Sequence, residues 1–240
     1  MPSLSLIAGQ TAPVETAEAA SAALRPSEYT AALIQVLHAR APLVRGAAAL
    51  EIGSGSGVVL AAMGECGAGS LCGVDIEPAA VASGALLLHR LGHGDKVEMH
   101  RGDMWRPLDG RRFDVIAANL PQFPMEAIGY DGRLPSWSAG GPDGRRLLDR
   151  FLAGLGAHLS PGGRAVITHN AFIGLETTRD LVARHGLGVR IAQSVLLHLT
   201  REKLDLMSPH ILLAEEGRSI HRYGPYAFGE MHVVEIAAGL

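Results

Sequence analysis

Two groups of residues in this sequence could do chemistry, and the first is a glycine-rich loop followed by an acid. Gly53, Gly55 and Gly57 lie between a hydrophobic run and an apolar segment of helical character. Glycines let the backbone turn sharply and approach a ligand where a Cβ would collide with it. Asp75 ends the next hydrophobic run, where its carboxylate could accept both hydroxyls of a ribose or, alternatively, cap a helix. The pattern predicts a site for a nucleoside-containing cofactor, with a plain flexible turn as the alternative.

The second group is Asn119 with Pro121 and Gln122, at the end of another hydrophobic run. An asparagine side-chain oxygen and a following backbone carbonyl can together accept both hydrogens of an NH2 group. That arrangement turns the nitrogen lone pair toward an electrophile for in-line attack. Pro121 suits the role because proline fixes φ and leaves its own carbonyl presented outward. Residues of these types could hold an NH2 group in this way.

The glycine spacing distinguishes two classes of cofactor. A dinucleotide fingerprint reads G-x-G-x-x-G, whereas residues 53–57 read G-x-G-x-G. Residues 50–57, Leu-Glu-Ile-Gly-Ser-Gly-Ser-Gly, resemble motif I of the class I S-adenosylmethionine-dependent methyltransferases, and residues 101–104, Arg-Gly-Asp-Met, resemble the adenine-binding turn of that family. The resemblance implies S-adenosylmethionine as the cofactor. The contact residues it implies are Glu51, Gly53, Ser54, Gly55, Gly57, Asp75, Ile76, Asp103, Met104 and Asn119.

Residues 119–122, Asn-Leu-Pro-Gln, resemble the N-P-P-Y motif of methyltransferases that act on planar or amide nitrogen, such as the release-factor glutamine methyltransferases. The resemblance implies a catalytic role for Asn119, Pro121 and Gln122. Leu120 replaces the first proline of the motif and Gln122 replaces its aromatic residue. Since that aromatic stacks on the plane of the substrate, its absence argues against a nucleobase as the acceptor.

Two further segments are similar to this branch of the family. Residues 140–144, Gly-Gly-Pro-Asp-Gly, are similar to a segment that precedes a helix in the release-factor enzymes, with a glycine hinge and an Asp143 helix cap as an equal reading. Residues 159–163, Leu-Ser-Pro-Gly-Gly, resemble the turn that leads into the fifth strand across the superfamily. The release-factor enzymes carry a helical domain that holds their protein substrate, whereas 46 residues precede the first predicted strand here. We therefore expect a small-molecule substrate.

Outside the motifs, polar and aromatic residues near predicted element ends are candidates for substrate binding. They are Tyr29, Trp137, His169 and Asn170. No H-E-x-x-H motif and no H-x-x-x-H spacing lies within a predicted helix, so we expect no metal site among the 11 histidines. The two cysteines, Cys66 and Cys72, form no pair of CxxC motifs, and we predict small buried residues there.

The elements that must position these residues alternate between β-like and helical patterns. The predicted strands cover residues 47–52, 70–75, 97–100, 113–118, 164–169, 189–197 and 231–236, and the predicted helices cover residues 27–41, 58–66, 78–91 and 147–158. This order is the βαβ pattern of a parallel sheet. The last strand follows a non-helical connection, which favours an antiparallel pairing. We predict an α/β fold with a doubly wound, seven-stranded, mostly parallel sheet and an antiparallel edge strand.

Two long connections, residues 120–144 and 198–230, would lie at or beside the carboxyl edge of that sheet, where such folds bind ligands. We divide the chain into residues 1–45, a lead-in and helix covering the site, and residues 46–240, the catalytic domain that binds the cofactor.

The composition limits the partners. Lys and Arg number 21 against 24 Asp and Glu, so the net charge of −3 gives no bulk attraction to nucleic acid or to an anionic membrane. No run of 18 or more apolar residues and no basic leader before an apolar stretch occurs, so we expect a cytoplasmic protein. The oligomeric state stays open, a homodimer included.

Three functions fit these observations. The first is a methyltransferase that acts on an amine or amide nitrogen of a small molecule, mainly by positioning and desolvation. The second uses the same cofactor for non-methyl chemistry, by intramolecular cyclisation or aminocarboxypropyl transfer, and one such product is methylthioadenosine. The third is a non-catalytic binding scaffold, against which the intact glycines and Asp75 argue.

Overall fold

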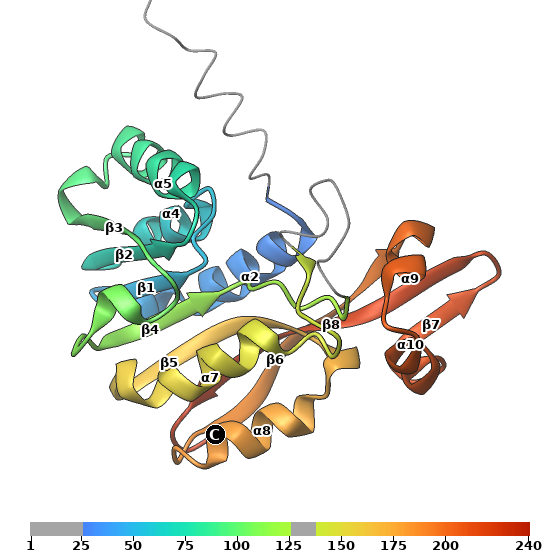
Figure 1. The fold of residues 1–240 in the computed structure, drawn as a ribbon. Coiled ribbons are helices and arrows are strands. Elements are labelled where there is room, and N and C mark those ends of the chain that lie inside the picture. The colour runs from blue at the N-terminus through green and yellow to red at the C-terminus, as the bar shows by residue number, and fades with distance from the viewer. Residues whose placement is uncertain (1–25, 126–137) are drawn as a thin grey trace, which may run out of the picture.

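The computed structural model describes residues 26–125 and 138–240 of the chain (Figure 1). In these ranges the strands are β1 (Ala48–Ile52), β2 (Ser70–Asp75), β3 (Val97–Arg101), β4 (Phe113–Ala118), β5 (Leu159–Asn170), β6 (Gly188–Leu199), β7 (Ile220–Tyr223) and β8 (Tyr226–Ala237). The α-helices are α2 (Glu28–Ala39), α3 (Ala41–Val44), α4 (Val58–Glu65), α5 (Pro78–Arg90), α7 (Arg146–His158), α8 (Leu175–Ala183), α9 (Arg201–Leu206) and α10 (Pro209–Glu215). Short 3-10 turns are η1 (Gly94–Lys96), η2 (Arg106–Leu108) and η3 (Ala171–Ile173). Of the helices in these ranges, none is long and apolar enough to cross a membrane.

The strands form one sheet in the order β3-β2-β1-β4-β5-β8-β6, and β7 pairs with β8 beside this path. Strands β1 to β5 run parallel, while β8 runs antiparallel to both β5 and β6. This confirms the predicted α/β fold class, a mostly parallel sheet with antiparallel pairing at one side. In detail, β8 lies one place in from the edge, between β5 and β6, and the four-residue β7 adds an eighth strand that was not predicted.

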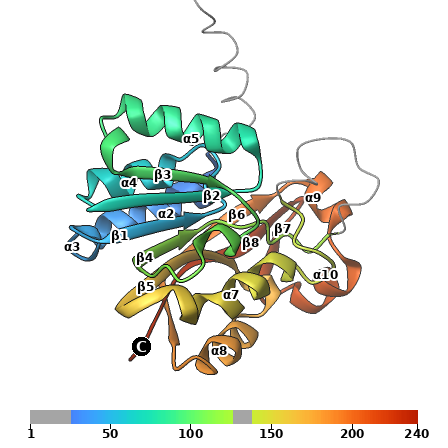
Figure 2. The same cartoon turned by 60° about the vertical axis from the view of Figure 1, so that its left-hand side comes forward.

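Helices cover both faces of the sheet (Figures 1 and 2). On one face α2, α4 and α5 bury an apolar cluster that includes Leu33, Leu60 and Leu88. On the other face α7 and α8 bury a second cluster that includes Phe151 and Val182. Because both faces are covered, the central strands can be apolar on both sides, as they are in β1 and β4. The carboxyl ends of the parallel strands are thereby fixed along one edge of the sheet.

Helix α7 shows how the sequence directs an element to its face. Its buried residues include Leu148, Phe151, Leu152 and Leu155, which follow the i, i+3, i+4, i+7 spacing of one helical stripe. Full burial of each such side chain stabilises the fold by ~1.5–3 kcal/mol. The stripe therefore sets the rotation of α7 about its axis and, with it, which residues the helix turns toward the sheet edge.

Residues 198–230 correct one expectation. The sequence predicted a long loop, but the structure contains α9, α10, β7 and the hairpin from β7 into β8. Figure 1 shows this group, which we call the arm, beyond the end of the helical layers. The two helices have 6 and 7 residues, too short to show a helical period, so the sequence pattern did not reveal them. Helix α8 was also not predicted.

The other long connection is described up to Met125 and from Ser138 onward. These two parts meet again, because the Phe123 N–H donates to the Ser138 carbonyl at 2.7 Å and isolated bridges join Phe123 to Ala139 and Met125 to Gly141. The chain after β4 therefore leaves the sheet edge and returns to it before α7.

Candidate active site

The loop between β1 and α4 places its three glycines in left-handed backbone. Their φ angles are 72° at Gly53, 50° at Gly55 and 78° at Gly57. A Cβ at Gly57 would lie 2.8 Å from the Cα of Gly84 in α5, so this glycine is required by helix packing. A Cβ at Gly53 would lie 3.3 Å from the Leu120 side chain, whereas one at Gly55 would meet no atom within 4 Å. The spacing thus serves the turn and the packing of the loop as well as access for a ligand.

Asp75 connects this loop to the neighbouring strand. Its Oδ2 accepts from the Gly55 N–H at 2.8 Å, and its Oδ1 accepts from the Glu77 N–H at 2.9 Å. The second bond shapes the turn before α5, whose N-cap is Glu77, so Asp75 itself is not the cap residue. Both carboxylate oxygens keep unused lone pairs for hydroxyl donors.

A cavity of about 400 Å³ opens along the ends of β1, β2 and β4. This volume lies in the range of pockets that take cofactors and drug-sized molecules. Six of the predicted cofactor residues line it: Gly53, Asp75, Ile76, Asp103, Met104 and Asn119. Ile76 is 61% exposed, which is unusual for its type and leaves an apolar surface at the cavity.

The sequence did not predict that α7 contributes to this cavity through Leu147 and Arg150. Arg150 Nη2 donates to Asp103 Oδ2 at 2.8 Å, and the Trp105 indole N–H donates to the Arg150 carbonyl at 3.3 Å. Met104 has φ 55°, the one positive value at a non-glycine in the described ranges. The Asp103 carboxylate therefore faces the cavity with a cation beside it, and a ligand amine would share it with Arg150.

Four other predicted cofactor residues are absent from the lining of this cavity: Glu51, Ser54, Gly55 and Gly57. Glu51 is buried in β1, where its Oε2 accepts from the Leu60 N–H at 3.3 Å and burial raises its pKa well above the usual value. Glu51 therefore lies beneath the glycine-rich loop and supports its backbone. Ser54 is also buried, and its Oγ has no hydrogen-bond partner within the described residues.

Asn119 follows β4 directly, and both ends of its side-chain amide are held. Thr168 Oγ1 donates to Asn119 Oδ1 at 2.8 Å, and Asn119 Nδ2 donates to Thr30 Oγ1 at 3.3 Å. Thr30 belongs to α2 and Thr168 to β5, so two distant segments meet on this one group. The second lone pair of Oδ1 remains available to another donor.

A second cavity of about 160 Å³ borders the same loop. It shares Asn119, Leu120 and Pro121 with the larger cavity. Its walls come from the start of α2, the loop after β4, the end of β5 and α9, with Tyr29, Asn170 and Lys203 among them. Two of the three residues predicted to act on a nitrogen, Asn119 and Pro121, therefore line both cavities.

Gln122 lines the smaller cavity, but the structure uses both ends of its amide. Nε2 donates to the Thr168 carbonyl at 2.7 Å, and Oε1 accepts from the Asn170 N–H at 3.2 Å. The side chain thus replaces a neighbouring strand beyond the end of β4, which stops at Ala118. With both ends of its amide engaged, Gln122 supports the loop after β4, and its catalytic role stays a prediction.

Two of the predicted substrate residues, Tyr29 and Asn170, meet at the smaller cavity. The Tyr29 hydroxyl donates to Asn170 Oδ1 at 2.9 Å. Burial raises the pKa of Tyr29 to about 12, so the hydroxyl keeps its proton at neutral pH. Tyr29 therefore presents a neutral aromatic side chain to the cavity that Asn119 and Pro121 also line.

The structure does not bring His169, a predicted substrate residue, to either cavity. Successive side chains of a strand point to opposite faces, so His169 points away from the face of Thr168 and Asn170. It is fully buried, with Nδ1 2.9 Å from the Asn170 carbonyl and Nε2 2.8 Å from Thr178 Oγ1. Burial and the positive charge of Arg145 lower its pKa to about 3. This histidine is a neutral structural group, and Trp137, the fourth predicted residue, lies outside the described ranges.

The Gly-Gly-Pro-Asp-Gly segment precedes α7, whose N-cap residue is Arg145 and not the predicted Asp143. Asp143 Oδ1 accepts from the Arg145 N–H at 2.9 Å, as a residue at a helix start can. The buried Arg145 guanidinium donates to the carbonyls of Ile173 and Gly174, at 2.8 and 3.0 Å. The segment thereby ties the start of α7 to the turn that follows β5, next to both cavities.

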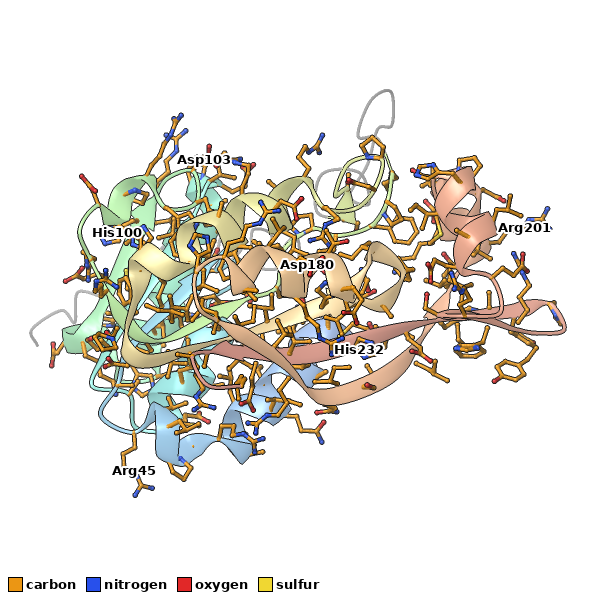
Figure 3. All side chains as sticks on the ribbon, turned by 90° about the horizontal axis from the view of Figure 1, so that it is seen from below. Arg45, His100, Asp103, Asp180, Arg201 and His232 are labelled. Carbon is orange, nitrogen blue, oxygen red and sulfur yellow. The ribbon has the colours of Figure 1, made fainter. Side chains whose placement is uncertain are left out.

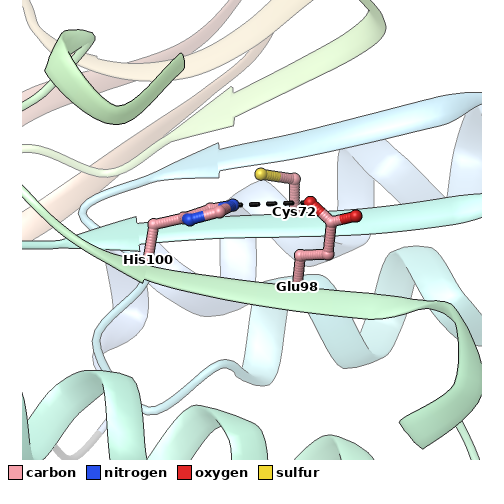
Figure 4. Close-up of side chains that lie close together, drawn as sticks. All are labelled: Cys72, Glu98 and His100. Carbon is pink, nitrogen blue, oxygen red and sulfur yellow. Dashed lines mark ion pairs between the residues drawn. The ribbon is translucent and has the colours of Figure 1, made fainter.

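Within the described residues one group of three side chains has the types that bind metals: Cys72, Glu98 and His100 (Figure 4). His100 Nε2 lies 3.4 Å from Glu98 Oε2. Arg111 donates to Glu98 at 2.8 Å and lies 3.3 Å from His100 Nε2, so a guanidinium already takes the lone pairs that a metal would need. Burial raises the pKa of Cys72 to about 11, which keeps it a thiol. The cluster is satisfied by Arg111 and lies outside both cavity linings.

Other polar residues near strand ends also lie elsewhere. His232 is paired with His169 in the sheet and its Nδ1 lies 2.8 Å from Ser194 Oγ, in the body of the molecule, while Arg201 lies out at the arm (Figure 3). Tyr223 and Tyr226 are exposed at the hairpin of the arm.

Comparisons with known proteins agree on a class of enzyme. Residues 50–121 match a protein family described as a methyltransferase domain. A protein of Methanocaldococcus jannaschii, provisionally named a protein N5-glutamine methyltransferase, is 34% identical over 146 residues, which are 60% of this chain and 72% of that protein. The release factor glutamine methyltransferase of Geobacter sulfurreducens is 31% identical over 147 residues, which are 58% of this chain and 50% of that enzyme. The chain thus spans about half the length of this second relative.

Among solved structures, the 16S rRNA N2 G1207 methyltransferase of T. thermophilus, in complex with AdoMet and guanosine, has a TM-score of 0.55 and 18% sequence identity. The match covers 89% of this chain and 44% of that one. At this identity the likeness shows a shared fold.

Proposed function

The chain belongs to the class I S-adenosylmethionine-dependent methyltransferases, and on this premise we propose that it transfers the methyl group of its cofactor to a primary amide nitrogen held at Asn119. One observation carries the proposal: a larger and a smaller cavity meet at Asn119, Leu120 and Pro121. A methyl transfer needs donor and acceptor on opposite sides of one point, in line with each other.

The larger cavity suits the cofactor. Asp75 would accept from the ribose hydroxyls, Asp103 from the adenine amine, and the loop that contains Ser54 would lie under the methionine part. The volume of about 400 Å³ and the two carboxylates fit this group. When bound, the cofactor supplies an electrophilic methyl group on a sulfonium.

The smaller cavity suits the acceptor. Asn119 Oδ1 and a main-chain carbonyl of the same loop would accept the two hydrogens of an NH2 group, which turns the nitrogen toward the larger cavity. Among the described residues that line the two cavities there is no histidine, and the Tyr29 hydroxyl stays protonated. Rate enhancement would come from orientation and from exclusion of water, with the amide proton leaving to solvent after transfer.

The favoured acceptor is the side-chain amide of a glutamine in a polypeptide. The names of both relatives point to protein glutamine methylation, which argues against our expectation of a small molecule. The cavity of about 160 Å³ has room for about five water molecules at ~30 Å³ each, and a glutamine side chain has five non-hydrogen atoms beyond Cα.

A free small-molecule amide is the second candidate. Glu28 and Lys203, of opposite charge, both line the smaller cavity. Two such groups could hold the ammonium and carboxylate of a free amino acid, which an internal glutamine lacks.

The test is methyl transfer from methyl-labelled S-adenosylmethionine to two probes, a short peptide with one internal glutamine and free L-glutamine, followed by mass spectrometry of the probe. We expect one methyl group on the side-chain amide of the peptide. Asn119→Ala should reduce turnover at least ~100-fold while the Kd for the cofactor changes less than ~3-fold. Labelling of L-glutamine alone would select the second candidate, and undiminished turnover by Asn119→Ala would contradict the proposed site.

A further inference from the structure

The side-chain amide of Asn119 can act on an acceptor only if its plane is fixed, and the structure shows what fixes it. An asparagine side chain rotates about its last bond, with a broad range of accessible angles when nothing holds it. Here the two ends of the amide bond different hydroxyls, Thr168 Oγ1 at 2.8 Å and Thr30 Oγ1 at 3.3 Å. A group tethered at both ends cannot turn without breaking one of these bonds.

We propose that Thr30 and Thr168 are positioning residues, which act on the transfer reaction by fixing Asn119, and that this holds for Thr168 even though it also lines the smaller cavity. This inference rests on the proposed function, because it concerns how the acceptor is aimed. Neither threonine belongs to a motif, and they lie 89 and 49 residues from Asn119 along the chain.

Both threonines are themselves held in place. Thr168 is 1% exposed, and its carbonyl accepts from Gln122 Nε2 at 2.7 Å, which fixes the backbone that carries the hydroxyl. Thr30 is 8% exposed, and its Oγ1 also accepts from the Ser27 N–H at 3.2 Å in the capping box of α2. A hydroxyl on a fixed backbone is a rigid reference point for the amide that it bonds.

The arrangement also joins three elements at the acceptor site. Helix α2 supplies Thr30 and the neighbouring Tyr29, the loop after β4 supplies Asn119, and β5 supplies Thr168. A small shift of α2 relative to β5 would therefore alter both the wall of the smaller cavity and the angle of the amide. A displacement of ~1 Å at a reacting group can cost ~100-fold in rate.

Thr168→Val tests the inference with the least disturbance, because valine keeps the shape and removes only the hydroxyl. We expect kcat for the glutamine peptide to fall ~10- to 100-fold, with the Kd for S-adenosylmethionine within ~3-fold of the unaltered protein. Thr168→Ser restores the hydroxyl and should recover most of kcat. Thr30→Val should lower kcat similarly but also weakens the start of α2, so Thr168 is the decisive position.

Thr178→Val is the matched control. Thr178 is a fully buried threonine that bonds His169 and Arg145 and lines neither cavity. Removal of the Thr178 hydroxyl should lower the unfolding free energy measured by urea titration without lowering kcat. If Thr168→Val changed kcat no more than Thr178→Val does, Thr168 would be structural only and the inference would be wrong.

A double-mutant cycle separates action through Asn119 from direct action. In an Asn119→Ala background, Thr168→Val should lower the residual kcat no further, since the group it positions is gone. Independent, multiplying losses would contradict the inference.

The exchange rate of the Asn119 side-chain NH2 with solvent, measured by nitrogen-15 NMR and assigned with Asn119→Asp, needs no acceptor. It should rise in Thr168→Val, and an unchanged rate would overturn the inference. Absence of methyl transfer in the unaltered protein would instead count against the proposed function, so the two failures are distinguishable.

Discussion

Among single residues, Asp75 is the group whose change should most affect cofactor binding. It lines the larger cavity, and its Oδ2 already accepts from the loop at Gly55 N–H. Asp75→Asn keeps the volume but removes the charge, which weakens a charge-assisted hydrogen bond by ~1.5–3 kcal/mol. We expect the Kd for S-adenosylmethionine, measured by calorimetry, to rise at least ~10-fold.

The control for this change is Asp180→Asn. Asp180 is exposed on α8 and lines neither cavity (Figure 3). The Kd of Asp180→Asn for S-adenosylmethionine should equal that of the unaltered protein. If Asp75→Asn also bound the cofactor with an unchanged Kd, there would be no basis for placing the ribose at Asp75.

His169 leads to a prediction about acid stability. Its pKa is about 3 in the folded protein, against 6.5 for an unperturbed histidine. Because the folded-state pKa is depressed, protonation favours unfolding, so the stability tied to the neutral ring is complete above pH ~6.5 and is lost as the pH falls toward 3. This one proton should contribute up to ~1.4 kcal/mol per pH unit to the slope of the unfolding free energy in that window.

Urea titrations between pH 7 and pH 4 measure this slope. His169→Gln should flatten it, whereas the exposed His210→Gln should leave it unchanged. An identical slope in the protein and in His169→Gln would show that the ring does not titrate as its burial implies.

At the scale of elements, two glycines of the turn from β1 into α4 differ in role, because Gly57 serves helix packing and Gly53 lines the larger cavity. Gly57 has φ 78° and its Cβ would lie 2.8 Å from the backbone of Gly84, while Gly53 has φ 72° and faces only the tip of Leu120 at 3.3 Å. Gly57→Ala should therefore lower the unfolding free energy by more than the ~1–2 kcal/mol of left-handed backbone strain alone.

Gly53→Ala should lower the unfolding free energy by about that strain, and it should weaken cofactor binding because Gly53 and Leu120 both line the larger cavity. Thermal and urea unfolding together with calorimetric Kd values compare the two variants. A larger loss of stability in Gly53→Ala than in Gly57→Ala would contradict the assigned roles.

The elements show which features the sequence could predict. Strands β2 and β4 have the predicted bounds, since each is a continuous apolar run in a sheet covered on both faces. The arm was taken for a loop because α9, α10 and β7 are each too short to show a period. Strand β7 is placed by its pairing with β8, and α9 and α10 by packing on the apolar cluster that also contains Phe172, none of which a local pattern shows.

The candidate site shows the same difference between residues that a local pattern predicts and residues whose place depends on contacts between distant segments. Asp75, Asp103 and Asn119 could be placed at the larger cavity from the sequence because each lies at the carboxyl end of a strand or within two residues of it, the edge where such folds bind ligands. Thr30, Thr168 and Arg150 could not, because their roles depend on contacts between distant segments. Side chains along a strand alternate between its two faces, so the neighbours His169 and Asn170 point in opposite directions. The sequence did not show which face of β5 is turned toward the smaller cavity, and so it could not show which of the two residues lines it.

At the scale of the whole molecule, the fold brings the two cavities together along one edge of a sheet, as the proposed transfer between a donor and an acceptor requires. The larger cavity is built from the first half of the sheet and α7, and the smaller one from α2, the end of β5 and the arm. Asn119 lies where these halves meet. The account therefore predicts a reaction between two bound molecules, which distinguishes it from chemistry on the cofactor alone.

The most direct test is the identity of the nucleoside that the protein forms from S-adenosylmethionine. Purified protein would be incubated with S-adenosylmethionine, with and without the glutamine peptide, and the nucleosides identified by mass spectrometry. The account predicts S-adenosylhomocysteine in amounts that match the methylated peptide and that vanish when the peptide is left out. Methylthioadenosine formed without any acceptor would contradict it, because the cofactor would then be the substrate.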